Sequence, residues 1–393
     1  MKLIFTGDFS ASGIFFQKIS SDEEILDKEV REVFQEADYV NINLENPITN
    51  ASFNKEKGSA LKAPPNTAQY LKDRHINICT LANNHIMDCG YNGLDDTVEA
   101  LNQNRILFYG VGGYHPYILL NKGDVKVALI ASCHKEGPLW DGHKPAPFSF
   151  RIKELKLLIK DIRDNAKPDY IIFSYHGGTE FNTVPEPKRR KFFHKLVDLG
   201  IDIIIGHHAH VPQGIEARGK SIIIYGLGNF CFDTPYQRKS AYTSESFFIE
   251  LNLAQGKPPQ INKYYLKIDR NNGYVSLNKD KNCDYFFNNR LQVFENLKKY
   301  YTHWEREAFR VYCSNNLNHS MERSEDLGKP MSLTSVNKNV RNHIDKNGLI
   351  RILLNSTKMI VSDAKNPSRR PLLIGAIKFI LKGGDRGADQ YRS

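Results

Sequence analysis

Short apolar runs that each end in a polar residue able to bind a metal constrain this fold most. The run Ile201–Ile205 is typical of a buried strand, and Gly206 follows it, before His207-His208-Ala209-His210. On extended backbone, side chains two positions apart point the same way, so we expect His208 and His210 to face one point and His207 the other side. Two imidazoles supply half the ligand shell of a zinc or manganese ion. A turn whose histidines make only local hydrogen bonds is the alternative.

The same pattern recurs through the first 230 residues. Apolar runs are followed in turn by Asp8, Glu45, Asn84 with His85, His134, His176, and Asn229. Helical patterns over residues 93–103, 150–165 and 188–199 separate several of these runs. The alternation predicts an α/β architecture in which functional side chains collect at strand ends.

Composition predicts a folded protein of roughly two domains, since the chain has 393 residues, 40% of them hydrophobic and 25% charged. The net charge of +10 is concentrated near the end: residues 341–393 carry 11 Lys or Arg and 4 Asp, or 11 − 4 = +7. The six cysteines are widely spaced without a Cys-x-x-Cys pair, which indicates free thiols in a reducing compartment.

The character of the sequence changes after about residue 256. Residues 261–269 and 274–277 predict a hairpin around an Asn-Gly turn, which closes a first domain at 1–280. The second region, 281–393, is basic and mainly helical. Its first helix is predicted to pack on the body of the protein through an apolar stripe made of Leu291, Phe294, Leu297, Tyr301, Trp304 and Ala308. Residues 314–337 are polar and are expected to form a loop or linker.

The apolar segment 371–381 lies between basic residues, within 369–382. Such a segment is too short to span a membrane but can lie on an anionic membrane surface. The alternative is a helix buried against the first domain or a second subunit. The basic residues are not interleaved with aromatic platforms, so we expect no nucleic-acid partner.

Two carboxylates, one amide and four imidazoles form the candidate site: Asp8, Glu45, Asn84, His85, His176, His208 and His210. A mixed oxygen and nitrogen set of this size suits two neighbouring divalent ions bridged by a carboxylate better than a structural zinc. Taken alone, each residue has a structural explanation, such as a helix cap or a turn. Their common position at strand ends favours one shared site.

Six ordered motifs over roughly residues 1–250 resemble the CapA family. They are Gly7-Asp8; Asn43-Leu44-Glu45-Asn46-Pro47; Leu81 to His85 with Asp88, Gly90 and Gly93; His176-Gly177-Gly178-Thr179-Glu180; Gly206 to Gln213; and Tyr225 to Phe230. These are the poly-gamma-glutamate capsule synthesis proteins, which are related to calcineurin-like metallophosphoesterases. The resemblance implies a metallophosphatase fold of two packed central sheets flanked by helices, here with a C-terminal, mainly helical extension.

The resemblance also implies roles for individual residues. Asp8 and His210 would hold one metal, Glu45 would bridge, and Asn84, His176 and His208 would hold the other. His85 would act as the acid beside the scissile group, with Glu180 as a second catalytic residue and Asn229 as a substrate-binding one. One or two manganese, zinc or iron ions per chain are expected.

The sequence departs from phosphoesterases at Asp8-Phe9-Ser10. Phosphoesterases have Asp-x-His there, so this chain has Ser10 in the place of a histidine. The first metal site should therefore be the weaker one. The expected function is hydrolysis of a phosphoester or amide in the biosynthesis of an anionic surface polymer. The alternative is a non-catalytic assembly factor that keeps the ligands for binding. Only three apolar residues follow Lys2, too few for a signal peptide, so we expect a cytoplasmic protein, peripheral to the inner face of the membrane.

Overall fold

The computed structural model describes residues 1–53, 60–134, 139, 141–280, 293–321 and 370–381. It divides into two units, Met1–Phe294 and Glu295–Ser393. The first unit begins with β1 (Lys2–Phe9), α1 (Ile14–Ser20), α2 (Lys28–Gln35), β2 (Tyr39–Leu44), α3 (Thr67–Asp73), β3 (Ile78–Thr80), α4 (Gly90–Gln103), β4 (Leu107–Tyr109), β5 (Val111–Gly112), β6 (Tyr117–Lys122), β7 (Val125–Cys133) and β8 (Ala146–Pro147). It continues with α5 (Ile152–Asp161), the π-helical turn η1 (Ile162–Ala166), β9 (Tyr170–His176), α6 (Pro187–Asp198), β10 (Ile203–His207), β11 (Ile215–Arg218), β12 (Ser221–Ile224), β13 (Asn229–Cys231), α7 (Pro235–Lys239), β14 (Glu245–Asn252), β15 (Gln260–Asp269) and β16 (Tyr274–Leu277).

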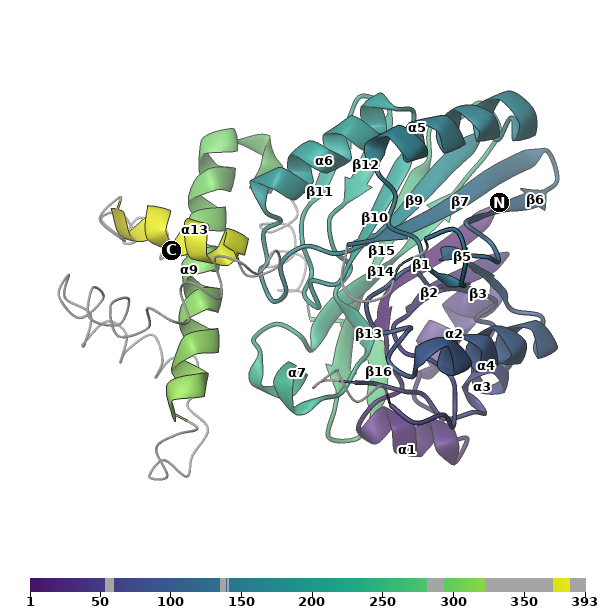
Figure 1. Ribbon diagram of the computed structural model, residues 1–393, viewed down its shortest axis with the longest axis horizontal. Coiled ribbons are helices and arrows are strands. Elements are labelled where there is room, and N and C mark those ends of the chain that lie inside the picture. The colour runs from purple at the N-terminus through teal and green to yellow at the C-terminus, as the bar shows by residue number, and fades with distance from the viewer. Residues whose placement is uncertain (54–59, 135–138, 140, 281–292, 322–369, 382–393) are drawn as a thin grey trace. The chain divides into compact units, whose positions relative to one another are not determined.

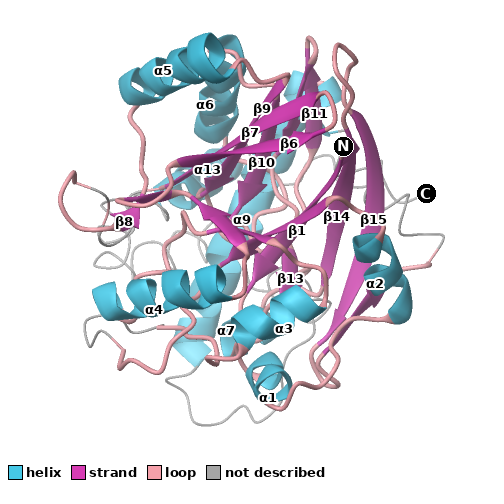
Figure 2. Cartoon of the chain, turned by 90° about the vertical axis from the view of Figure 1, so that its right-hand side faces the viewer, coloured by secondary structure: helices cyan, strands magenta, loops and turns pink. Residues whose placement is uncertain are grey.

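Two large sheets form the centre of this unit (Figure 1). One has eight strands in the order β16-β15-β14-β1-β2-β3-β4, with β13 pairing β1, and the other has six in the order β11-β12-β10-β9-β7-β6. Helices α1 to α4 lie on the side of the first sheet, and α5 and α6 on the side of the second (Figure 2). The expected α/β fold, two packed sheets flanked by helices, is confirmed.

Strand β1 shows how the sequence builds two cores. Its side chains alternate between faces, so Leu3 and Phe5 pack between the two sheets while Ile4 packs under α1 to α4. All three are fully buried. A continuous apolar run is therefore what this central strand requires, because both of its faces are covered.

Parallel pairing brings strand ends to one edge of the molecule. Strands β1 and β2 are parallel neighbours, as are β9 and β10, and His176 pairs in register with His207. Near Asp8 the pairing of β1 shifts register on both sides, a bulge that redirects the side chain. The polar residues at these ends therefore meet, as expected for α/β sheets.

Glycine is required where two backbones approach closely behind this edge. A Cβ on Gly7 would lie 2.1 Å from the Gly228 carbonyl oxygen, and one on Gly206 would lie 2.1 Å from that of Tyr225. Both contacts are shorter than any tolerated carbon–oxygen distance. Gly206 therefore serves close packing of β10 against the 225–228 loop, whereas the turn itself is made by His208 and His210, which have positive φ angles.

The second unit contains α9 (Leu297–Met321) and α13 (Arg370–Leu381), after the 3-10 turn η2 (Val293–Glu295) that spans the boundary. These two helices pack against each other: a Cβ on Gly375 would lie 2.5 Å from that of Ala308. The apolar stripe predicted for α9 was partly wrong. Phe294, Trp304 and Ala308 are buried as predicted, whereas Leu297 and Tyr301 are exposed. Tyr300 is fully buried in place of Tyr301.

The first C-terminal helix extends further than predicted, and several predicted residues are outside the described part of the chain. The loop predicted to begin at residue 314 is helical as far as Met321, because polar residues continue the α9 helix. Residues 322–337 lie outside the described part, as do Leu291, Arg369 and Lys382. None of the helices in the described residues is long and apolar enough to span a membrane. Cys79, Cys89, Cys133 and Cys231 are buried free thiols.

Candidate metal centre

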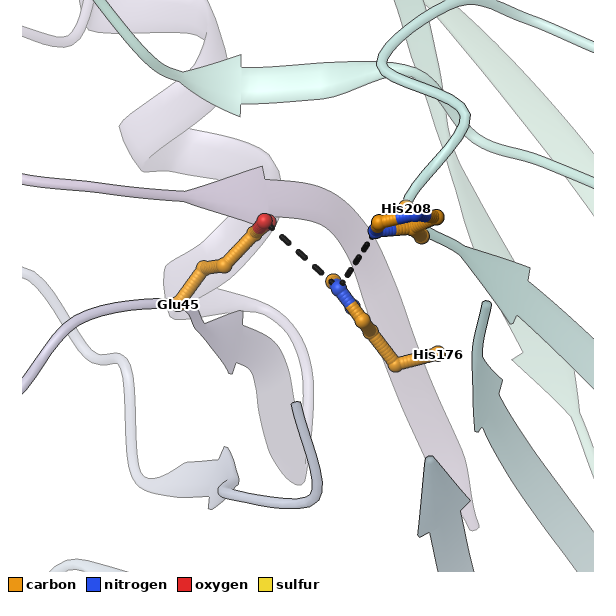
Figure 3. Close-up of side chains that lie close together, drawn as sticks. All are labelled: Glu45, His176 and His208. Carbon is orange, nitrogen blue, oxygen red and sulfur yellow. Dashed lines mark hydrogen bonds and ion pairs between the residues drawn. The ribbon is translucent and has the colours of Figure 1, made fainter. Parts of the chain in front are cut away.

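Two groups of buried ligand atoms share one carboxylate. Glu45, His176 and His208 form one group, and Asp8, Glu45 and His210 form the other, with the ligand atoms of each group within 4.8 Å of one another. Figure 3 shows the ring of His176 pointing between the Glu45 carboxylate and His208. Four strands, β1, β2, β9 and β10, or the loops after them, therefore deliver these side chains to one point.

His176 lies at the centre of the first group. Its Nε2 is 3.1 Å from Nδ1 of His208, 2.9 Å from Oδ1 of Asn84 and 3.5 Å from Oε1 of Glu45. An imidazole nitrogen carries at most one proton, so it can donate to only one of these three atoms. A cation among these atoms would satisfy all of them, and the residues therefore fit a divalent metal.

The second group is organised around Asp8. Its Oδ2 lies 3.4 Å from Nδ1 of His210, and Oε1 of Glu45 lies 3.8 Å from Nε2 of the same ring. Asn229 holds His210 from behind, with Oδ1 3.0 Å from Nδ1. Rings of Phe181 and Phe232 flank His210 with centroid distances of 5.7 and 4.8 Å. The ring is thus fixed on three sides.

The protonation states suit metal binding. Burial, together with the neighbouring imidazoles, lowers the pKa of His176 far below its usual value. Burial also lowers the pKa of His210 to about 4, although Asp8 and Asn229 act in the opposite direction. For Asp8, burial would raise the pKa, but His207, His210 and the Asn43 hydrogen bond together outweigh it and the pKa is lowered. Neutral imidazoles and ionised carboxylates are the forms that bind divalent ions.

His85 occupies the rim of the site. It is 9% exposed, more than His176, His208 or His210, and its Nδ1 lies 2.7 Å from Oδ2 of Asp88. Asp88 is fully buried and accepts a second hydrogen bond, from the Leu61 amide. A carboxylate can only accept, so this contact places the Nδ1 proton between the two residues and leaves Nε2 for a ligand or substrate.

The other two residues predicted for the site, Glu180 and Asn229, differ in how far they are buried. Glu180 is half-buried in the loop after β9, next to Phe181, whose backbone amide donates to the Ala209 carbonyl. Asn229 is fully buried, and its amide also contacts Gln237 and the Thr243 carbonyl. These contacts favour a role in holding His210 over the substrate contact expected from the sequence. His134 donates its backbone amide to the His176 carbonyl.

Two buried residues of the site were not identified from the sequence. Asn43 donates from Nδ2 to Asp8 at 2.9 Å and lies 3.1 Å from Nδ1 of His176. Its position near the end of β2, two residues before Glu45, was the available signal. His207 was expected to face away, yet its Nδ1 lies 2.9 Å from Oδ1 of Asp8. That expectation was wrong because His208 and His210 have positive φ, so the segment is not an extended strand.

Comparison with known proteins finds relatives for the part of the chain that carries the candidate site. The family model described as bacterial capsule synthesis protein PGA_cap matches residues 2–234. Capsule biosynthesis protein CapA of Bacillus anthracis is 28% identical over 276 residues, which cover 64% of this chain and 66% of that protein. PGA biosynthesis protein CapA of Bacillus subtilis is 29% identical over 259 residues, covering 63% and 67%. The chain thus spans about two thirds of the length of these relatives.

A third relative and two solved structures extend the comparison. A probable polyglutamine synthesis accessory protein of Mycobacterium tuberculosis is 31% identical over 229 residues, covering 54% of this chain and 59% of that one. A novel phosphatase from Mycoplasma pneumoniae is 16% identical, with 70% of this chain and 90% of that chain covered and a TM-score of 0.39. A 5'-nucleotidase precursor from Thermus thermophilus is 12% identical, with 68% and 54% covered and a TM-score of 0.42.

Proposed function

Because this chain belongs to the bacterial capsule synthesis protein family PGA_cap, we propose that it is a metal-dependent hydrolase of capsule or surface-polymer biosynthesis. It would cleave a phosphoester or an amide bond. The observation that carries the proposal is the position of Glu45, a buried carboxylate that belongs to both ligand groups. Such sharing is the arrangement required for two adjacent divalent ions.

The substrate class follows from the relatives. Their names refer to capsule, PGA and polyglutamine synthesis, which points to an anionic polymer such as poly-gamma-glutamate, a polysaccharide, or a phosphoester precursor of either. For this chain these substrates are proposals.

Asp8, Glu45 and His210 would hold one ion, and Glu45, Asn84, His176 and His208 the other. Manganese, zinc or iron suits this oxygen and nitrogen set. When bound, such ions supply Lewis-acid activation of the scissile group and of the attacking water.

The protein's own residues handle the proton. Nε2 of His85 would donate to the leaving group, while Asp88 keeps the opposite nitrogen protonated and fixes the ring. His85 is the least buried of the four imidazoles predicted for the site, at 9% exposed against 2–3% for the others, which favours contact with the leaving group. Glu180, which lies on the loop after His176, is proposed as a second catalytic residue that assists this proton transfer.

A second candidate is a non-catalytic assembly factor that binds metal and polymer without hydrolysis. The observation that favours it is the side chain of Ser10, which brings no imidazole to the Asp8 group and whose Oγ is buried with no hydrogen-bond partner among the described residues. The Asp8 group then has three ligands, whereas the His176 group gains Asn84 as a fourth.

The experiment that separates these functions measures bound metal and hydrolysis together. Purified wild type, His208→Ala and the control His143→Ala, which alters an exposed histidine, would be assayed for manganese, zinc and iron and for turnover of a general phosphoester. Two ions per chain with turnover lost only in His208→Ala would support the hydrolase. One ion or fewer in the wild type, without turnover, would support the assembly factor.

We also propose that the C-terminal region contacts an anionic membrane surface, which would make the protein peripheral to the inner face of the membrane. Helix α13 buries Leu373 and Ala376 but exposes Ile374, Ile377 and the cation Lys378. Basic and apolar groups side by side are the requirement for such binding. Full-length protein should sediment with phosphatidylglycerol vesicles and not with phosphatidylcholine vesicles. Binding that is unchanged in Ile374→Glu/Ile377→Glu would contradict this proposal.

A further inference from the structure

His207 is the least explained imidazole of the site. Its side chain is 2% exposed, and Nδ1 lies 2.9 Å from Oδ1 of Asp8. Nε2 is buried and has no hydrogen-bond partner in the described part of the chain. The ring belongs to neither of the ligand groups found among the described residues. Its known contact is therefore with a ligand of the metal centre.

The Asp8 carboxylate is held by protein donors on both oxygens. Oδ1 accepts from Nδ2 of Asn43 at 2.9 Å and lies at hydrogen-bond distance from His207, and Oδ2 accepts from the His208 backbone amide at 3.1 Å. A carboxylate cannot donate, so the proton of a neutral His207 lies on Nδ1. These donors fix the rotation of Asp8 and turn Oδ2 toward His210.

Orientation matters more in this group than in its neighbour. The Asp8 group has three ligand residues, whereas the His176 group is completed by Asn84. With fewer ligands, the loss of alignment in one of them removes a larger share of the binding. Residues that orient metal ligands through hydrogen bonds commonly change metal affinity by about 10- to 100-fold.

We propose that His207 is a positioning residue that sets the metal affinity of the Asp8 group by donating its Nδ1 proton to Oδ1 of Asp8. This inference rests on the proposed metal site. It assigns His207 no contact with substrate or with the ion. His207 acts only through the angle at which Asp8 presents its second oxygen.

Three substitutions at residue 207 test which nitrogen matters. His207→Asn keeps an amide donor near the position of Nδ1, His207→Gln places one near Nε2, and His207→Ala keeps neither. Metal-free protein would be titrated with Mn²⁺ and followed by electron paramagnetic resonance. We expect one of two binding events to weaken by about 10- to 100-fold in His207→Ala and His207→Gln, and to recover in His207→Asn.

The outcomes separate this inference from the proposed function. Two ions of unchanged affinity in His207→Ala would overturn the role of His207 and leave the metal site intact. Recovery by Gln but not by Asn would also overturn it, since Nε2 would then be the functional atom. Wild-type protein that binds no Mn²⁺ would overturn both.

A measurement on the wild type keeps the test independent of variant folding. In protein labelled with ¹⁵N-histidine, long-range ¹H–¹⁵N correlation spectra distinguish the two neutral tautomers of each ring. His207 should be the Nδ1-protonated form in the metal-free protein. The Nε2-protonated form would overturn the proposal.

Discussion

Oε1 of Glu45 lies 3.5 Å from Nε2 of His176, and the same oxygen lies 3.8 Å from Nε2 of His210. One buried carboxylate oxygen thus faces an imidazole from each ligand group. Both rings come from the six-stranded sheet or the loop after it, whereas Glu45 follows a strand of the eight-stranded sheet. The site is therefore assembled only when the two sheets pack.

Replacing the proposed acid should reduce turnover without removing metal. We expect His85→Gln to lower kcat by about 10²- to 10⁴-fold, because glutamine cannot transfer a proton to the leaving group as an imidazole can. Metal content, measured by elemental analysis, should stay at the wild-type value. Loss of metal together with activity would instead make His85 a ligand.

Asp88→Asn tests the partner of His85 separately. The amide can present a donor to Nδ1 and thereby favour the wrong tautomer, so we expect kcat to fall while KM changes little. The pH profile of kcat should shift relative to the wild type. An unchanged kcat and profile would show that the contact at 2.7 Å is structural only.

The buried imidazoles predict an acid-sensitive metal-free protein. The pKa of His210 is about 4 when folded, against a usual value of 6.5, because burial disfavours its charged form. Between pH 6.5 and 4 the unfolded chain therefore binds more protons, so stability is full above this window and falls as the pH is lowered through it. His210 alone accounts for about 3 kcal/mol. Urea unfolding with a chelator present should show the fall, and His210→Gln should reduce it.

Asn229→Ala distinguishes positioning from substrate contact. Its Oδ1 lies 3.0 Å from Nδ1 of His210, so the variant should weaken metal binding by about 10-fold. KM measured with saturating metal should change little. A raised KM with normal metal affinity would restore the substrate-binding role predicted from the sequence.

A methyl group at Gly206 should be far more damaging than one nearby. A Cβ there meets the Tyr225 carbonyl at 2.1 Å, and backbone cannot move aside as a side chain can. We expect Gly206→Ala to lose about 3 kcal/mol of unfolding free energy. Gly226→Ala is the matched control, because its nearest neighbour is the Gln213 side chain at 3.2 Å. Equal effects would contradict this packing account.

The sequence was sufficient to predict where the site forms, because apolar runs and the residues after them can be read directly. Asp8, Glu45 and His176 follow from strand position alone. The direction of His207 does not, since it depends on the left-handed backbone of His208. Local periodicity carries no signal for such a turn in a non-glycine residue.

The periphery was less predictable for a different physical reason. Helix α9 has aromatic residues on neighbouring positions, Tyr300 and Tyr301, and only packing decides which is buried. Strand β14 was not recognised, although Phe247, Phe248 and Ile249 are fully buried. It pairs antiparallel with β1, where Phe5 is opposite Ile249 and Lys2 is opposite Asn252, and a partner so distant in the sequence is invisible to a local pattern.

The most direct test of the central claim is anomalous diffraction from crystals soaked in Mn²⁺. The account predicts two anomalous peaks flanking the Glu45 carboxylate, one beside His176 and His208 and the other beside Asp8 and His210. In Glu45→Gln both peaks should weaken. A single peak that does not involve Glu45, or no peak at the edge where the two sheets meet, would contradict a centre built around a shared carboxylate.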